Sequence, residues 1–142
     1  MAVDRARIGY SLPAFEVRAS AARIAAFARA IGSTDPAPAV APPTFMKAVE
    51  GEHNSSRRIL EALGVDLKRV LHAEQQFDYL APIRCGDLLR VTRTVTDIYA
   101  RRTGAMEFIG IESSVTRVAD GELAGRSRQI VLVRHPVPKA AA

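Results

Sequence analysis

The sequence is poor in the residues that staple small proteins or build metal centres. Cys85 is the only cysteine among the 142 residues, which excludes an internal disulfide and a cysteine-rich metal site. Tryptophan is absent, and aromatic residues make up 6% of the chain. Hydrophobic residues nevertheless make up 48%, and a chain of this length buries roughly 70% of its unfolded surface. We therefore expect one domain, residues 1–142, held together by an ordinary hydrophobic core.

Long hydrophobic runs are also absent. No stretch reaches the roughly 18 consecutive apolar residues that a membrane-spanning helix needs. The opening residues, MAVDRARIGYSLP, lack the apolar centre of a secretory signal peptide. We expect a cytoplasmic protein with no membrane partner.

Acidic residues are fewer than basic ones, and the formal net charge is +5. A basic surface favours anionic partners, but pairs such as Arg57–Arg58, Lys68–Arg69 and Arg101–Arg102 are scattered along the chain. No aromatic residues interleave with them and no nucleic-acid motif is present. We expect no nucleic acid as partner. A diffuse basic surface fits an acidic carrier protein or a coenzyme A thioester equally well, and any single pair is most simply a solvated surface.

The first half of the chain alternates short elements with a proline-rich loop. Residues 14–18 alternate as in a short strand. Residues 20–31 are predicted to form a buried helix, because Ser20 suits an N-cap, apolar residues follow at helical spacing, and Gly32 suits the end of a helix. Four prolines then prevent regular structure between residues 36 and 43. A second helical pattern begins near Asn54 or Ser55 and stops at Gly64.

From Val70 onward the hydrophobic period changes to two. Four strand-like segments follow one another, with turn signals at Gly86–Asp87, near Gly104 and at Asp120–Gly121. The pattern predicts a four-stranded antiparallel meander and a frayed tail from about residue 136. Helices followed by strands indicate an α+β domain, with the helix of residues 20–31 lying across the sheet.

A long helix wrapped by an antiparallel sheet is the hot-dog architecture, and particular residues support it. The stretch HAEQQFDYLAPIRCGDLL, which begins at His72, resembles the N-terminal-type MaoC-like dehydratase domain. FARAIG at 27–32 and APPTF at 41–45 resemble segments of the same family. The resemblance runs from about residue 14 to 134 and implies a hot-dog fold. The matching positions in the first stretch are His72, Gln75, Gln76, Phe77, Pro82, Ile83, Gly86 and Asp87.

The resemblance implies the addition of water to acyl thioesters, or its removal, without a metal ion or another cofactor. The substrate would be carried on coenzyme A or on acyl carrier protein. The reaction needs a base for the α-proton and an acid for the leaving hydroxyl. Active members carry these groups as Asp and His in a loop of the form G-D-x-N-P-x-H. Here the loop reads GSTDPAP, so Ser33 and Pro38 occupy the Asp and His positions. We therefore expect no catalytic residue in this loop.

The same resemblance implies a partner. In related two-subunit dehydratases, one hot-dog subunit carries Asp and His, and the silent one shapes the acyl channel. This chain resembles the silent subunit of a heterodimeric (3R)-hydroxyacyl-thioester dehydratase or enoyl hydratase. A homodimer that uses different residues is the alternative.

Three residues are fallback candidates for acid–base chemistry, each with a structural alternative. His53 could act near the pocket or merely precede a helix. His72 could line the pocket or the subunit interface, or only make structural hydrogen bonds. Asp35 could act as a base, although an Asp before a proline commonly caps a turn. Cys85 has no histidine nearby in the sequence and is expected to contribute packing alone.

The segment Pro42, Pro43, Thr44, Phe45 and Met46 is the candidate for contact with an acyl chain or pantetheine. It combines a rigid turn with apolar side chains, and the alternative is a loop packed on the core. Two other functions stay open: a thioesterase that uses Glu50 or Glu52 as base, and an acyl-thioester binding module without enzymatic activity.

Overall fold

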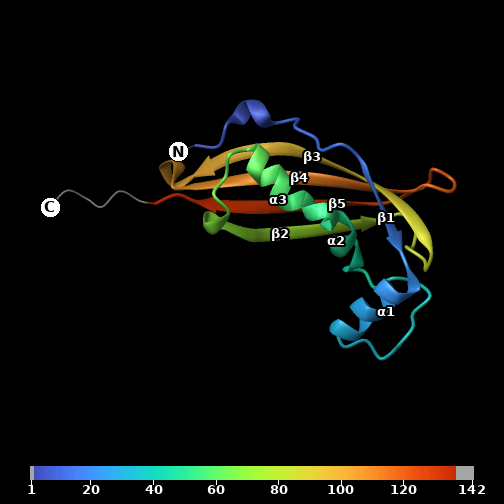
Figure 1. Ribbon diagram of the computed structural model, residues 1–142. Helices are drawn as coiled ribbons and strands as arrows, with labels where there is room; N and C mark the ends of the chain where they lie inside the picture. Colours follow the sequence, from blue (N-terminus) through green and yellow to red (C-terminus); the bar gives the residue numbers. More distant parts are fainter. Residues whose placement is uncertain (1, 137–142) are drawn as a thin grey trace.

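The computed structural model describes residues 2–136, so the predicted tail lies, except for Pro136, outside the described residues. Figure 1 shows a long twisted sheet with short helices on one face and a lobe at one end. The elements in chain order are η1 (Arg5–Arg7), β1 (Phe15–Ala19), α1 (Ala21–Ala30), α2 (Phe45–Glu50), η2 (Glu52–Asn54), α3 (Ser55–Ala62), η3 (Leu67–Arg69), β2 (Val70–Tyr79), β3 (Asp87–Arg101), η4 (Arg102–Gly104), β4 (Met106–Arg117) and β5 (Leu123–Arg134).

The strands form one antiparallel sheet in the order β1-β3-β4-β5-β2. The predicted meander is right for β3, β4 and β5 but wrong for β2, which pairs with β5 at the far edge. A turn signal cannot distinguish a hairpin from a crossover. Strands β2 and β3 lie three strand spacings apart, about 14 Å, and the seven residues between them, 80–86, can reach across that distance.

The helix that lies on the sheet is also different from the predicted one. Residues 21–30 do form a helix, capped by the Ser20 hydroxyl, but α1 projects beyond the end of the sheet (Figure 1). Only Ile24 and Ala28 of α1 are buried, because its apolar stripe is narrow and rich in alanine. The sheet is covered by α2 and α3 instead. Helix α2 was not predicted, and it is joined to α3 through two residues in the left-handed region, His53 and Asn54.

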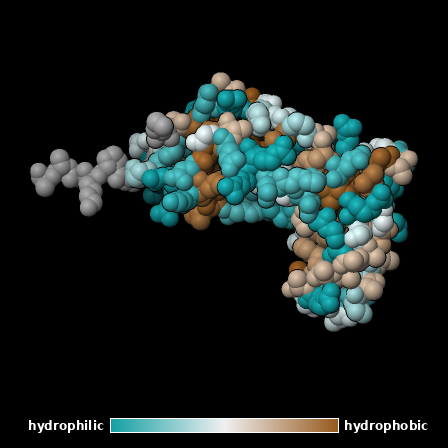
Figure 2. Space-filling model, viewed as in Figure 1, coloured by the Kyte–Doolittle hydropathy of each residue, from teal (hydrophilic) through white to brown (hydrophobic). Residues whose placement is uncertain are grey.

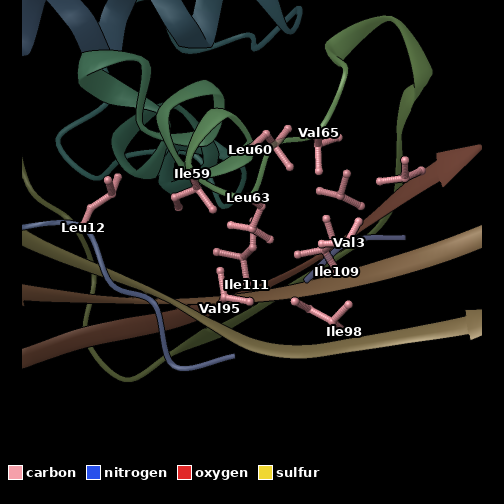
Figure 3. Packing of buried hydrophobic residues seen from close by; sticks show 12 residues of the cluster. Val3, Leu12, Ile59, Leu60, Leu63, Val65, Val95, Ile98, Ile109 and Ile111 are labelled. Carbon is pink, nitrogen blue, oxygen red and sulfur yellow. The ribbon is translucent and has the colours of Figure 1, made fainter. Parts of the chain in front are cut away.

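Two apolar clusters form the core. In the first, α3 packs its buried face on β3, β4 and β5 (Figure 3). In the second, α2 packs against α1 and against β1 and β3. Among the glycines, Gly125 of β5 has the closest neighbours: an added Cβ would lie 2.6 Å from the Asp78 carbonyl oxygen and 2.7 Å from the Met46 methyl group. Members of the first cluster include Ile59, Leu60, Leu63, Val95, Ile109 and Ile111, and members of the second include Ile24, Phe45, Met46, Val49, Leu89 and Val91.

Candidate functional site

An apolar groove of about 430 Å³ opens between the proline-rich loop and the segment that follows β2. Two of its side chains are large, apolar and exposed: Val40 at 41% and Leu80 at 62%. Figure 2 shows more apolar surface over the lobe formed by α1 and this loop than over the strongly hydrophilic body. The residues that line the groove are Val40, Ala41, Pro43, Tyr79, Leu80, Ala81, Pro82 and Ile83.

Backbone hydrogen bonds fix the two walls of the groove to each other. The amide of Ala41 donates to the carbonyl of Ile83 at 2.8 Å, and the amide of Cys85 donates to the carbonyl of Ala39 at 3.0 Å. The Tyr79 hydroxyl donates to the Pro43 carbonyl at 2.6 Å. Because prolines leave the loop few donors of its own, these contacts from outside the loop decide its course.

The predicted substrate contacts are divided between the groove and the core. Pro43 lines the groove, while Pro42 is half-buried and Thr44 is exposed beside it. Phe45 and Met46 lie in the second apolar cluster, at 1% and 0% exposure. These two side chains therefore pack in the core, as the alternative interpretation expected.

Sequence reasoning missed the opposite wall of the groove, Tyr79 to Ile83. The available signal was Tyr79 at the end of β2, three residues before the family-like Pro82–Ile83 pair. Burial raises the pKa of Tyr79 above 10.0. The phenol therefore stays protonated near neutral pH and can donate a hydrogen bond there.

The loop that would carry catalysis holds no acid–base pair. Ser33 is exposed, and its hydroxyl accepts a hydrogen bond from the Asp35 amide at 3.3 Å. The Asp35 carboxylate accepts from the Ala37 amide at 3.0 Å. Asp35 thus caps a turn, as the alternative to its role as a base expected. Pro38 offers only its carbonyl oxygen, which accepts from the Cys85 thiol at 3.2 Å. Among the groove-lining residues, Tyr79 is the only titratable side chain.

None of the three histidines lines the groove. His53 is exposed, packs edge-on against Phe15, and has Nε2 3.4 Å from the Glu16 carbonyl oxygen. His72 is exposed on β2, with Nε2 3.0 Å from the Glu74 carbonyl oxygen. The third histidine, His135, was not a candidate; it lies beside the Val70 end of β2, far from the groove at the Tyr79 end. The structure therefore does not bring His53, His72 and Asp35 together into one site.

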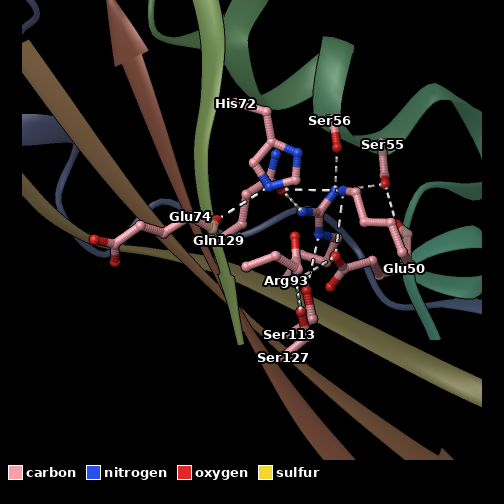
Figure 4. A network of polar contacts seen from close by, with 11 residues as sticks. Glu50, Ser55, Ser56, His72, Glu74, Arg93, Ser113, Ser127 and Gln129 are labelled. Carbon is pink, nitrogen blue, oxygen red and sulfur yellow. Dashed lines mark hydrogen bonds and ion pairs between the residues drawn. The ribbon is translucent and has the colours of Figure 1, made fainter. Parts of the chain in front are cut away.

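A buried polar network, also not predicted, lies between the helices and the sheet (Figure 4). At its centre Arg93 of β3 is 1% exposed. Its guanidinium donates to the Ser113 hydroxyl at 2.9 Å and to Gln129 Oε1 at 2.8 Å. It also donates to the hydroxyls of Ser55 and Ser56 at 2.8 and 2.7 Å. These contacts join α3 to β3, β4 and β5 across the core.

Glu50 supplies the negative charge of this network and is fully buried. Lys47 Nζ lies 3.3 Å from its Oε1, and Gln75 Nε2 donates to the same oxygen at 3.2 Å. Burial lowers the pKa of Arg93 and that of Lys47, and the nearby Glu50 carboxylate opposes both shifts. Glu52, the other predicted thioesterase base, is paired with Arg23. Neither carboxylate lines the groove.

Within residues 2–136, no group of three or more His, Cys, Asp or Glu side chains could hold a metal ion. The same part of the chain contains no helix that is long and apolar enough to cross a membrane.

Residues 6–125 match the protein family described as "FAS1-like, dehydratase domain region". The chain belongs to this dehydratase family. Among its relatives, the UPF0336 protein of Streptomyces griseus is 34% identical over 113 residues, 67% of this chain and 73% of that protein. The UPF0336 protein of Thermobifida fusca is 32% identical over 154 residues, 97% of this chain and 98% of that protein.

Solved structures of dehydratases share the fold. The HadBC (3R-hydroxyacyl-ACP dehydratase) complex of Mycobacterium tuberculosis has a chain with a TM-score of 0.72 at 18% identity, covering 89% of this chain and 96% of that one. A MaoC-like dehydratase gives a TM-score of 0.77 at 24% identity, covering 91% of this chain but 42% of the longer one. The predicted α+β hot-dog fold and the MaoC-like resemblance are confirmed.

Proposed function

We propose that this dehydratase-family chain is a catalytically silent hot-dog subunit of a (3R)-hydroxyacyl-thioester dehydratase or enoyl hydratase. It binds part of the acyl thioester for a partner subunit that carries Asp and His. One observation carries the proposal. The groove built by the family's loop has apolar walls and contains no carboxylate or imidazole.

Reversible hydration needs a positioned base and a positioned acid, each contributing about 10²–10⁴ in rate. Ser33 and Pro38 provide neither group at the loop positions where the family has them. A protonated Tyr79 can orient a ligand through hydrogen bonding but is a poor base at neutral pH. An apolar groove with one oriented hydroxyl therefore suits binding of an acyl chain better than turnover.

The partner docks along the free edge of β2. This strand has ten residues and pairs only with β5, so one row of its backbone amides and carbonyls has no neighbouring strand in the described structure. Edge strands of this kind pair readily with another chain. Leu71 and Leu80, at 50% and 62% exposure, lie at the two ends of this edge and would be covered by a partner. The HadBC and ChsH1-ChsH2 complexes of M. tuberculosis, each with a chain that shares this fold, support a second chain as partner.

The test is hydration of crotonyl-CoA, followed as loss of the enoyl-thioester absorbance. The chain is assayed alone, and then co-purified with a hot-dog subunit that carries the family's Asp and His. We expect turnover only in the complex, and loss of that turnover when the partner's His is replaced by Ala. Full activity of this chain alone would contradict the silent-subunit assignment.

A binding module without enzymatic activity is the second candidate, because the same lack of acid–base groups supports it. It predicts binding of acyl-CoA to the groove and no turnover with any hot-dog partner. Free thiol should not appear in either case, since the buried Glu50 and the paired Glu52 lie outside the groove lining. Thiol release that disappears in Glu50→Gln would instead establish a thioesterase.

A further inference from the structure

A basic cavity of about 360 Å³ lies at the opposite end of β2 from the groove. Lys68 and Arg69 of η3 and Arg134 of β5 contribute three exposed cations to its lining. The remaining lining residues are Val70, Leu71, His135 and Pro136, so no carboxylate belongs to the lining. A concave site with cations and no acid attracts an anion more strongly than isolated surface charges do.

Contacts at the rim hold the cavity in shape. The Asp66 carboxylate caps η3 by accepting from the Lys68 amide at 3.0 Å. Its other oxygen lies 3.7 Å from Arg69 Nε, a long and exposed pair that neutralises Arg69 only weakly. His135 is fixed by its amide, which donates to the Ala105 carbonyl at 2.9 Å, and by Nε2, which lies 2.6 Å from Glu107 Oε1. The acidic groups nearby, Asp66 and Glu107, are thus engaged by residues at the rim and do not themselves line the cavity.

Pairing of the β2 edge with a partner strand decides which groove the cavity lies close to. Val70 and Tyr79 stand at opposite ends of the strand, about 30 Å apart at the usual rise per residue. The cavity is thus far from the groove of its own chain. In an antiparallel pair of edges, however, the Val70 end of one chain lies beside the opposite end of the partner's strand. There a partner of the same fold has its own groove and catalytic loop.

We propose that this cavity binds the phosphate of the pantetheine arm whose thioester lies in the partner's active site. This inference rests on the proposed function. The phosphate is common to coenzyme A and to the carrier-borne arm. Guanidinium groups match its oxygens with paired hydrogen bonds, and the ammonium of Lys68 adds charge. The silent chain thus contributes a binding site across the interface in addition to its own groove.

The experiment uses the complex with its catalytic partner and three crotonyl thioesters: pantetheine, 4′-phosphopantetheine and coenzyme A. The test variant is Lys68→Ala/Arg69→Ala/Arg134→Ala in this chain. The control is Arg57→Ala/Arg58→Ala/Arg102→Ala, which removes the same charge from exposed sites elsewhere. We expect the test variant to raise KM for the two phosphorylated substrates about tenfold or more, as loss of charged hydrogen bonds does. Its kcat and its KM for the pantetheine thioester should match those of the control.

An unchanged KM for crotonyl-4′-phosphopantetheine would overturn the assignment, as would an equal rise with the phosphate-free thioester. A rise in KM seen only with crotonyl-CoA would also overturn the assignment, because the cavity would then bind the nucleotide phosphates of coenzyme A. If the complex forms but does not turn over, the proposed function fails separately. In that case, titration calorimetry with 4′-phosphopantetheine decides: weaker binding to the test variant than to the control supports the phosphate site, and equal binding refutes it. Failure of the two chains to associate refutes a site that acts across the interface.

Discussion

The groove and the Arg93 network place opposite kinds of side chain at the two ends of helix α2. The groove, just before α2, has apolar walls and one protonated phenol. The network, at the end of α2 and the start of α3, contains Lys47, Glu50 and Arg93, and two of these three are almost fully buried. Charged groups suited to catalysis thus exist in this chain, but they lie outside the groove lining and are engaged in hydrogen bonds with one another's neighbours in the core.

The difference shows that burial of charge need not indicate an active site. Nη1 of Arg93 donates to α3, while Nε and Nη2 donate to side chains of β4 and β5. The Glu50 carboxylate balances the charge of Lys47 and Arg93. Such a network favours one position of the helices over the sheet, because any shift leaves a charged group unpaired. The groove contains no such charged network: packing, a few backbone hydrogen bonds and the Tyr79 hydroxyl define it.

The largest expected effect comes from removing the centre of the network. Arg93→Met should lower the free energy of unfolding by about 3–5 kcal/mol, since it leaves Glu50 buried with Lys47 as its remaining cationic neighbour. Urea denaturation measures the change. Arg90→Met on the same strand is the matched control, because Arg90 is exposed, and it should change stability by less than about 0.5 kcal/mol.

A double-mutant cycle sharpens this result. If the charge of Glu50 is what makes the loss large, Arg93→Met together with Glu50→Gln should destabilise by less than the sum of the two single changes. Strict additivity would mean that the hydrogen bonds of Arg93, rather than its charge, stabilise the fold.

A smaller effect is expected beneath the groove, at Gly125. Gly125→Ala places a Cβ against the Asp78 carbonyl oxygen and the Met46 methyl group, and it should destabilise by about 1–3 kcal/mol. Because the first of these atoms belongs to the backbone of β2, hydrogen exchange should quicken along the β2–β5 pairing. Adding Met46→Ala to Gly125→Ala relieves only the side-chain contact, so faster exchange should persist in the double variant. Exchange restored to the wild-type rate would place the clash at Met46 alone.

The sequence predicted the elements better than their arrangement. Ser20 and Gly32 located α1, and alternation located every strand, because these signals are local. The partner of β2 and the helix that covers the sheet depend on contacts between distant segments, and both predictions were wrong. The absence of Asp and His from the loop could be read from Ser33 and Pro38 directly. Arg93 could not be recognised, because an arginine in an alternating strand gives no sign of which side chains its burial will bring together.

The smallest effect concerns Tyr79, the polar group of the groove. Tyr79→Phe removes one hydrogen bond, to the Pro43 carbonyl, and should lower stability at neutral pH by about 0.5–1.5 kcal/mol. Since burial raises the pKa of Tyr79 above its unfolded value of 10.0, the folded state retains the phenolic proton longer than the unfolded state. Stability should therefore fall as the pH rises above about 10, and this fall should be weaker in Tyr79→Phe.

Urea denaturation at pH 7 to 11 measures both effects, with Tyr99→Phe as the control because that ring stacks on Phe108 in the sheet. Lys47 acts in the opposite direction, because its lowered pKa makes stability rise with pH up to its unfolded value of 10.5. Its contribution is present in all three proteins and cancels in the comparison. A Tyr79→Phe variant that keeps the whole alkaline loss would mean that burial does not raise the pKa of Tyr79, and that the phenol is open to water in the folded protein.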